Sequence, residues 1–117
     1  MIELYLPYPP SLNQIYGHSK FAVYLRRVGK EYHSAVADAV REQYTGETLT
    51  DKIEIEIVLH PPTRVRRRDL DNCLKILLDA LTKAEVWEDD SLIVALRMKW
   101  GPPEKDGGVQ LTIKKAP

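Results

Sequence analysis

The chain has 117 residues, of which 44% are hydrophobic and 29% are charged. This composition is typical of one globular domain and excludes a disordered or fibrous protein, so we expect residues 1–117 to form a single domain around one core. The 17 basic and 17 acidic residues cancel, and any binding to nucleic acid must therefore depend on where the charges lie.

The N-terminal segment carries Glu3 and Pro7 where a secretory signal would need an uninterrupted apolar core. No window of the sequence approaches the roughly 18 apolar residues that a membrane span requires. The single cysteine, Cys73, excludes an intramolecular disulfide and a zinc site built from several cysteines. We therefore expect a soluble protein of a reducing, intracellular compartment.

The first half of the chain predicts a strand, a long loop and a helix. Residues 2–6 form the expected strand, and residues 11–27 are polar and aromatic without a lasting period, which indicates an ordered loop with one short strand near Val23. Apolar residues at helical spacing then predict a helix from Val28 to Tyr44, which Gly46 ends.

The second half predicts a strand, a helix and two strands. Residues 52–60 alternate between apolar and polar, as a half-buried strand does. A stripe of leucines predicts a helix from Asp69 or Leu70 to about Ala84, and residues 92–100 alternate again before a last strand at 109–113. The order of elements predicts a compact α+β domain in which two main helices pack on a small mixed β-sheet.

A cluster of charges precedes and opens the second helix. Its basic residues, with no acid among them, are Arg64, Arg66, Arg67 and Arg68. Asp69 and Asp71 follow directly, and Lys75 comes one helical turn later. Asp90 lies in the turn before the next strand, which can approach the helix start if both fall at the same end of the sheet.

Carboxylates gathered in this way favour a divalent cation. Two carboxylates about 4 Å apart repel by roughly 4 kcal/mol at an effective dielectric near 20, and a cation removes that penalty. Asp69, Asp71 and Asp90 offer only hard oxygen ligands, which favours Mg²⁺ or Mn²⁺ over zinc. A lysine at the position of Lys75 can orient a phosphate oxygen beside such a site.

Simpler interpretations of the same residues remain open. Asp69 can be a helix N-cap, and Asp71 can complement the helix dipole. Lys75 can be a solvated partner of Asp71 and Asp79 at i, i+4 spacing, and Asp90 can be an ordinary turn acid. The histidines show no ligand spacing and receive no role.

Several motifs resemble the RusA family of Holliday-junction resolvases. They are Arg67-Arg68-Asp69-Leu70-Asp71-Asn72, Lys75, Asp79-Ala80-Leu81-Thr82-Lys83-Ala84, Val86-Trp87, Asp89-Asp90, and the opening Leu6-Pro7-Tyr8-Pro9-Pro10-Ser11 with Asn13. The resemblance covers most of the chain in the same order. It implies a Mg²⁺-dependent endonuclease, with Mn²⁺ as a substitute, that acts in DNA recombination and repair as a homodimer and nicks four-way junctions symmetrically. It also implies a bacterial cytoplasm, with members encoded by prophages.

The resemblance assigns the family's essential aspartates to Asp69, Asp71 and Asp90, and its essential lysine to Lys75. The residues expected to contact DNA are Arg64, Arg66, Arg67, Arg68, Asn13, Lys20, Arg26, Arg27 and Lys30. Exposed apolar residues of the final strands are candidates for the dimer interface. One departure is Glu85, which stands where the family commonly has glycine and would cost on the order of 1 kcal/mol in a left-handed backbone.

Two other functions remain open on the residues. The chain can be a non-catalytic, structure-specific nucleic-acid-binding protein in which the aspartates are only caps. It can also be a hydrolase that uses two carboxylates as acid and base, although the arginine cluster has no purpose in that chemistry.

Overall fold

The computed structural model describes residues 1–10, 16–18, 23–25, 27–63 and 70–117. The elements are strands β1 (Ile2–Leu6), β2 (Tyr16–His18) and β3 (Val23–Leu25), helix α2 (Arg27–Gln43), strand β4 (Ile53–His60), helix α3 (Asp71–Lys83), the 3₁₀ helix η1 (Asp90–Leu92), and strands β5 (Ile93–Trp100) and β6 (Gly108–Lys115). This confirms the predicted small α+β fold with two main helices.

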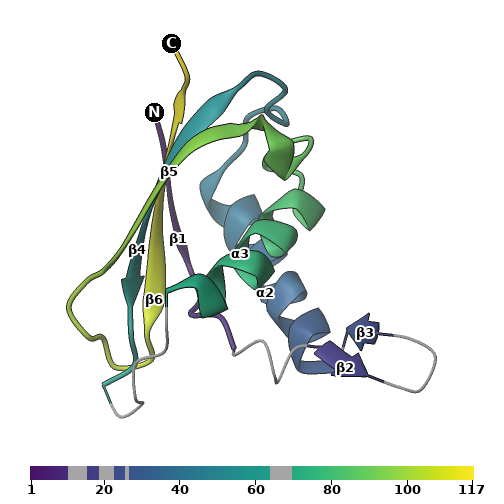
Figure 1. The fold of residues 1–117 in the computed structure, drawn as a ribbon, viewed down its shortest axis with the longest axis vertical. Coiled ribbons are helices and arrows are strands. Elements are labelled where there is room, and N and C mark those ends of the chain that lie inside the picture. The colour runs from purple at the N-terminus through teal and green to yellow at the C-terminus, as the bar shows by residue number, and fades with distance from the viewer. Residues whose placement is uncertain (11–15, 19–22, 26, 64–69) are drawn as a thin grey trace.

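The main sheet has four strands in the order β1-β6-β4-β5. Strand β6 pairs antiparallel with both β1 and β4, whereas β4 and β5 are parallel and joined through α3. Both helices cover the same face of this sheet (Figure 1), and β2 and β3 form a separate hairpin before α2. The sheet is therefore mixed, as predicted.

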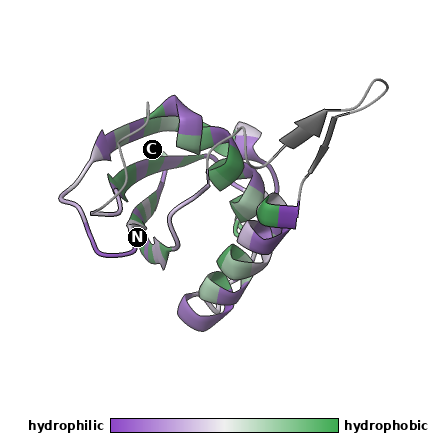
Figure 2. Cartoon of the chain, turned by 90° about the horizontal axis from the view of Figure 1, so that it is seen from below, coloured by the Kyte–Doolittle hydropathy of each residue, from purple (hydrophilic) through white to green (hydrophobic). Residues whose placement is uncertain are grey.

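The core lies between this face of the sheet and the helices. Along β4, Ile53, Ile55, Ile57 and Leu59 are buried and alternate with partly exposed residues. Figure 2 shows the corresponding bands of hydrophobic and hydrophilic residues along the strands and the two-sided colouring of the long helices. Burying apolar area of this kind is the main force that holds the elements together.

Helix α3 presents its apolar stripe slightly differently from the prediction. Its fully buried residues are Cys73, Ile76, Leu77, Ala80 and Leu81. Leu70, Leu74 and Leu78, which the leucine pattern places in the stripe, are only partly buried at its border. Cys73 is a buried packing residue, as expected.

Strand β5 departs from the predicted simple alternation. The pairing with β4 runs from Ile53 opposite Ile93 to Glu54 opposite Ala95, so Val94 has no partner and bulges. Val94 and Leu96 remain 51% and 40% exposed, because β5 is an edge strand whose apolar side is not fully covered. In contrast, Val109, Leu111 and Ile113 of β6 are buried, so among the final strands only β5 offers exposed large apolar side chains in the described residues.

The strand pair before α2 and the polarity of the helices complete the fold. A short strand near Val23 is confirmed as β3, but its partner β2 was not predicted, since three residues show no readable period. Among the described helices, none is long and apolar enough to cross a membrane.

Candidate active site

Asp71 is the first residue of α3 and is exposed to solvent. Its negative charge therefore stands at the helix N-terminus, where the helix dipole favours an anion. Leu70, which precedes it, makes no side-chain cap. Asp69 and the proposal that it caps the helix lie outside the described residues.

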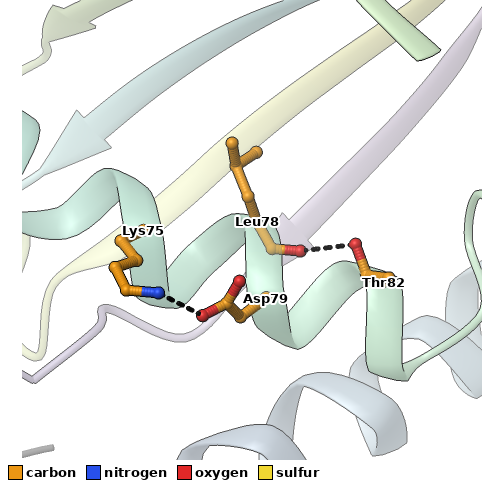
Figure 3. Close-up of polar contacts among 4 residues, drawn as sticks. All are labelled: Lys75, Leu78, Asp79 and Thr82. Carbon is orange, nitrogen blue, oxygen red and sulfur yellow. Dashed lines mark hydrogen bonds and ion pairs between the residues drawn. The ribbon is translucent and has the colours of Figure 1, made fainter. Parts of the chain in front are cut away.

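Lys75 and Asp79 form an ion pair along the same side of α3. The Lys75 Nζ donates to Asp79 Oδ2 at 3.3 Å, and the two side chains are 61% and 36% exposed (Figure 3). This is the i, i+4 contact that the simpler interpretation of Lys75 predicts. The contact places the ammonium group of Lys75 beside Asp79.

Helix α3 ends in a Schellman motif, which sets the direction of the following turn. The Glu85 N–H donates to the Thr82 carbonyl at 3.0 Å and the Val86 N–H to the Leu81 carbonyl at 3.2 Å. Glu85 has a φ of 62° and is the only non-glycine residue of the described segments with a positive φ. Glutamate thus adopts the left-handed conformation at the position that the family resemblance marks for glycine.

Trp87 anchors the turn onto α3. Its indole is completely buried, and its Nε1 donates to Thr82 Oγ1 at 2.7 Å. The Thr82 hydroxyl donates in turn to the Leu78 carbonyl at 3.0 Å (Figure 3). Backbone hydrogen bonds on both sides of Trp87, from Leu49 to Val86 and from Glu88 to Leu49, hold the chain at this point.

The two acids of the turn have different surroundings. Asp89 caps η1 and accepts from the Ser91 backbone N–H at 3.1 Å, and its hydrogen bonds to the Ser91 side chain and backbone lower the pKa of Asp89. Asp90 is the first residue of η1 and is exposed; its backbone carbonyl accepts from the Ile93 N–H, whereas its carboxylate has no hydrogen-bond or ion-pair partner among the described residues. The carboxylate of Asp89 is thus engaged as the cap of η1, while Asp90 keeps an open carboxylate.

A cavity of about 440 Å³ lies between α2, the second half of α3 and this turn. Its lining residues are His33, Asp79, Thr82, Lys83, Asp89 and Asp90. Asp71 is not among them, because at 1.5 Å per residue it lies roughly 12 Å along α3 from Asp79. Asp90 therefore shares this cavity with Asp79, the acid that pairs with Lys75.

His33 is the member of this cavity that the sequence did not indicate. Its Nε2 is buried and accepts or donates no hydrogen bond among the described residues. Burial lowers the pKa of His33, an effect that the negative charge of Asp79 opposes and the positive charge of Lys83 reinforces. Only the packing of α2 on α3 places this histidine here, so no sequence spacing could have found it.

The expected metal ligands fit a hard cation in their chemistry, since Asp71 and Asp90 both present exposed carboxylate oxygens. The described residues include no group of three His, Cys, Asp or Glu side chains close enough to hold a metal ion. Asp69, the third expected ligand, lies outside these residues. The three-aspartate site therefore stays a prediction.

Most of the expected DNA contacts also lie outside the described residues, namely Arg64, Arg66, Arg67, Arg68, Asn13, Lys20 and Arg26. Arg27 begins α2 and pairs with Glu31 at 2.9 Å, with its side chain 91% exposed. Lys30 is exposed on the same helix. Both are accessible to a polyanion.

Comparison with known proteins identifies the family. The model for "Endodeoxyribonuclease RusA" matches residues 7–114. Crossover junction endodeoxyribonuclease RusA of Escherichia coli K12 is 40% identical over 108 residues, which cover 92% of this chain and 89% of the relative, and the protein of that name from Enterobacteria phage 82 matches to the same extent. The Shigella sonnei protein is 39% identical over the same shares. This chain therefore belongs to the endodeoxyribonuclease RusA family.

Proposed function

We propose that this protein is a crossover junction endodeoxyribonuclease that resolves Holliday junctions by paired, symmetric nicks. The observation that carries the proposal is the 40% identity to the Escherichia coli and phage 82 enzymes over 92% of the chain. The reaction class is hydrolysis of DNA phosphodiester bonds, and the substrate is four-way DNA formed in recombination and repair.

Asp69, Asp71 and Asp90 would hold Mg²⁺, for which Mn²⁺ would substitute. The exposed carboxylates of Asp71 and Asp90 support this assignment. Bound there, the cation would lower the pKa of a water molecule and neutralise charge on the leaving oxygen. Lys75 would bind a non-bridging oxygen of the scissile phosphate.

The basic residues would hold the DNA on either side of the scissile phosphate. Arg64, Arg66, Arg67 and Arg68 would neutralise flanking phosphates, and the exposed Arg27 and Lys30 on α2 would extend this surface. Contacts with phosphates position DNA without reading its sequence. Affinity for the junction would therefore fall steeply as salt rises.

A homodimer suits the substrate, because two equivalent sites related by a two-fold axis match a junction of nearly two-fold symmetry. The exposed edge and apolar side chains of β5 support self-association, since an unpaired edge strand offers backbone groups for another strand. Relatives from bacteria and from a phage support action on bacterial or prophage DNA in the cytoplasm.

The proposal is tested with a labelled four-way junction, linear duplex and single strand, each with Mg²⁺ or with a chelator. We expect paired nicks on the junction that require the metal and are lost in Asp71→Asn while binding persists. Asp38→Asn is the matched control, because Asp38 is an exposed acid that pairs with Arg41 on α2, away from the cavity residues.

Other results would contradict parts of the proposal. Cleavage that persists in chelator would exclude the metal mechanism. Binding to the junction without cleavage under any divalent ion would point to a non-catalytic binding protein. Indifference to DNA would contradict the nucleic-acid function altogether.

A further inference from the structure

Asp79 lies at the meeting point of two parts of the proposed active site. Its Oδ2 accepts a hydrogen bond from Lys75 Nζ at 3.3 Å, and Asp79 also lines the cavity that contains Asp90. No role in the reaction follows for Asp79 from the three-aspartate assignment. Its position nevertheless connects the proposed lysine to the proposed third aspartate.

An exposed ion pair on a helix usually stabilises the fold by only a few tenths of a kcal/mol. The simpler interpretation of Asp79 is therefore a surface ion pair without a role in the reaction. The surroundings of Asp79 differ from those of the other described pairs. Its side chain is 36% exposed, whereas the acids of the other pairs, Glu31, Asp38, Glu56 and Asp51, range from 41% to 73%. Asp79 is therefore the least exposed acid among the ion pairs of the described residues.

Asp79 lies close to the contact between α3 and α2. His33 of α2 shares the cavity with Asp79, and the charge of Asp79 raises the pKa of His33 against the effect of burial. A partly buried carboxylate is a better anchor than one on an open surface, because fewer rotamers compete with the bound one.

We propose that Asp79 is a positioning residue that holds the Lys75 ammonium group for contact with the DNA phosphate beside Asp90. The inference rests on the proposed junction cleavage. A lysine loses up to about 2 kcal/mol of side-chain entropy when it is fixed, and an anchor already in place removes part of that loss from the reaction. An ammonium group has three N–H donors, so it can bind Asp79 and a phosphate oxygen together.

A double-mutant cycle tests whether Asp79 acts through Lys75. Single-turnover cleavage of a four-way junction in Mg²⁺ is measured for the unsubstituted protein, Asp79→Asn, Lys75→Ala and the double variant, with excess protein. Junction affinity is measured separately in chelator. We expect Asp79→Asn to lower the cleavage rate about tenfold, the size of a charge-assisted hydrogen bond, with affinity unchanged.

In the Lys75→Ala background, Asp79→Asn should change the rate by less than about twofold, because the interaction is already lost. Asp79→Glu should recover part of the rate, since it restores a carboxylate. Equal rate losses in both backgrounds, or no loss in either, would overturn the inference. A fall in affinity that accounts for the whole effect would also overturn it.

Two controls separate this inference from the proposed function and from misfolding. Asp38→Asn makes the same chemical change in an exposed pair on α2 and should leave the rate unchanged. Thermal unfolding of each variant shows that the fold is intact. If the unsubstituted protein cleaves junctions and Asp79→Asn cleaves equally well, only the role of Asp79 fails; if the unsubstituted protein does not cleave, the proposed function fails and the role of Asp79 with it.

Discussion

Glu85 holds a backbone conformation that glycine adopts at lower cost. Its φ of 62° places it in the left-handed region, at the end of α3. Because its side chain is exposed, replacement removes backbone strain without removing a core contact. We expect Glu85→Gly to raise the free energy of unfolding by about 1 kcal/mol, which corresponds to roughly 4 °C in Tm.

Urea denaturation with the linear extrapolation measures this gain. The control is Lys83→Gly, two residues earlier in the right-handed helix, which should lose about 1 kcal/mol instead. Equal losses from the two glycines would contradict the account of strain at Glu85.

His33 should make the folded protein less stable as the solution becomes acidic. Burial lowers its pKa from the ordinary value of 6.5, so the unfolded chain binds a proton that the folded chain resists. Stability is therefore fully present above about pH 6.5 and falls as pH drops from there toward the lower pKa of the folded state. Asp79 and Lys83, which face His33 from α3, modulate the size of the effect.

We expect His33→Gln to flatten this dependence. The free energy of unfolding, measured in urea between about pH 5 and about pH 8, should fall less in the variant than in the unsubstituted protein. The other histidines are present in both proteins, so their contributions cancel in the comparison. Parallel pH profiles would show that His33 is not held in its neutral form.

At the scale of elements, α3 and the turn after it form one unit held by Thr82. The Thr82 hydroxyl accepts from the buried Trp87 indole at 2.7 Å and donates to the Leu78 carbonyl. Thr82→Val keeps the shape but leaves a buried N–H without an acceptor. We expect it to cost about 1 to 3 kcal/mol of stability and to lower junction cleavage, because this turn carries Asp90.

Thermal unfolding and the cleavage assay measure the two effects of Thr82→Val. Thr82→Ser retains the hydroxyl and serves as the control, with stability and cleavage close to the unsubstituted protein. A valine variant as stable as the serine variant would mean that the Trp87 hydrogen bond contributes nothing to the turn.

The elements that could be predicted from the sequence are those whose buried side chains recur at one regular spacing. Strand β4 and helix α3 bury side chains at spacings of two and of three to four, so both were found within a residue or two. The bulge of β5 was not predicted, because it depends on how this strand pairs with β4, a contact that no local pattern contains. The strand β2 was missed for the related reason that three residues carry too little pattern.

The same distinction applies to the site. The contact between Lys75 and Asp79 could be predicted from the sequence, because residues four apart lie about one turn apart on the same side of a helix. The family pattern marked Glu85 as a position where glycine is common, but only the structure shows that its backbone is left-handed. The sequence could not predict that His33 and Asp90 lie near Asp79, because this arrangement arises from the packing of α2 and the turn against α3. Contacts within one element follow from spacing, whereas contacts between elements follow from the fold.

At the scale of the whole molecule, β5 forms an edge of the main sheet that the helices do not fully cover. Leu96, Met98 and Trp100 pair in register with the buried Ile55, Ile57 and Leu59, so they lie on the helix-covered face. They are nevertheless partly or largely exposed, because β5 is the outermost strand on that side. An apolar edge of this kind favours association with a second copy, which would pair the same surface with itself.

We therefore expect Leu96→Lys to weaken the proposed homodimer. A charge on each copy would face its equivalent across a two-fold axis, and burying it without a partner is unfavourable. Light scattering over a dilution series should show a larger monomer fraction at each concentration than for the unsubstituted protein. In the junction assay, the monomer should lose the coupling between the two nicks, so singly nicked junctions accumulate.

Val28→Lys is the matched control for association, since Val28 is 43% exposed, close to the 40% of Leu96, but lies on α2 rather than on the sheet edge. It should leave the mass in solution unchanged. If both lysine variants remain dimeric while the unsubstituted protein is a dimer, the two-fold interface lies elsewhere and the apolar edge of β5 has another role. If Leu96→Lys alone is monomeric and nicks only one strand at a time, the exposed edge of the sheet is what joins the two active sites on one junction.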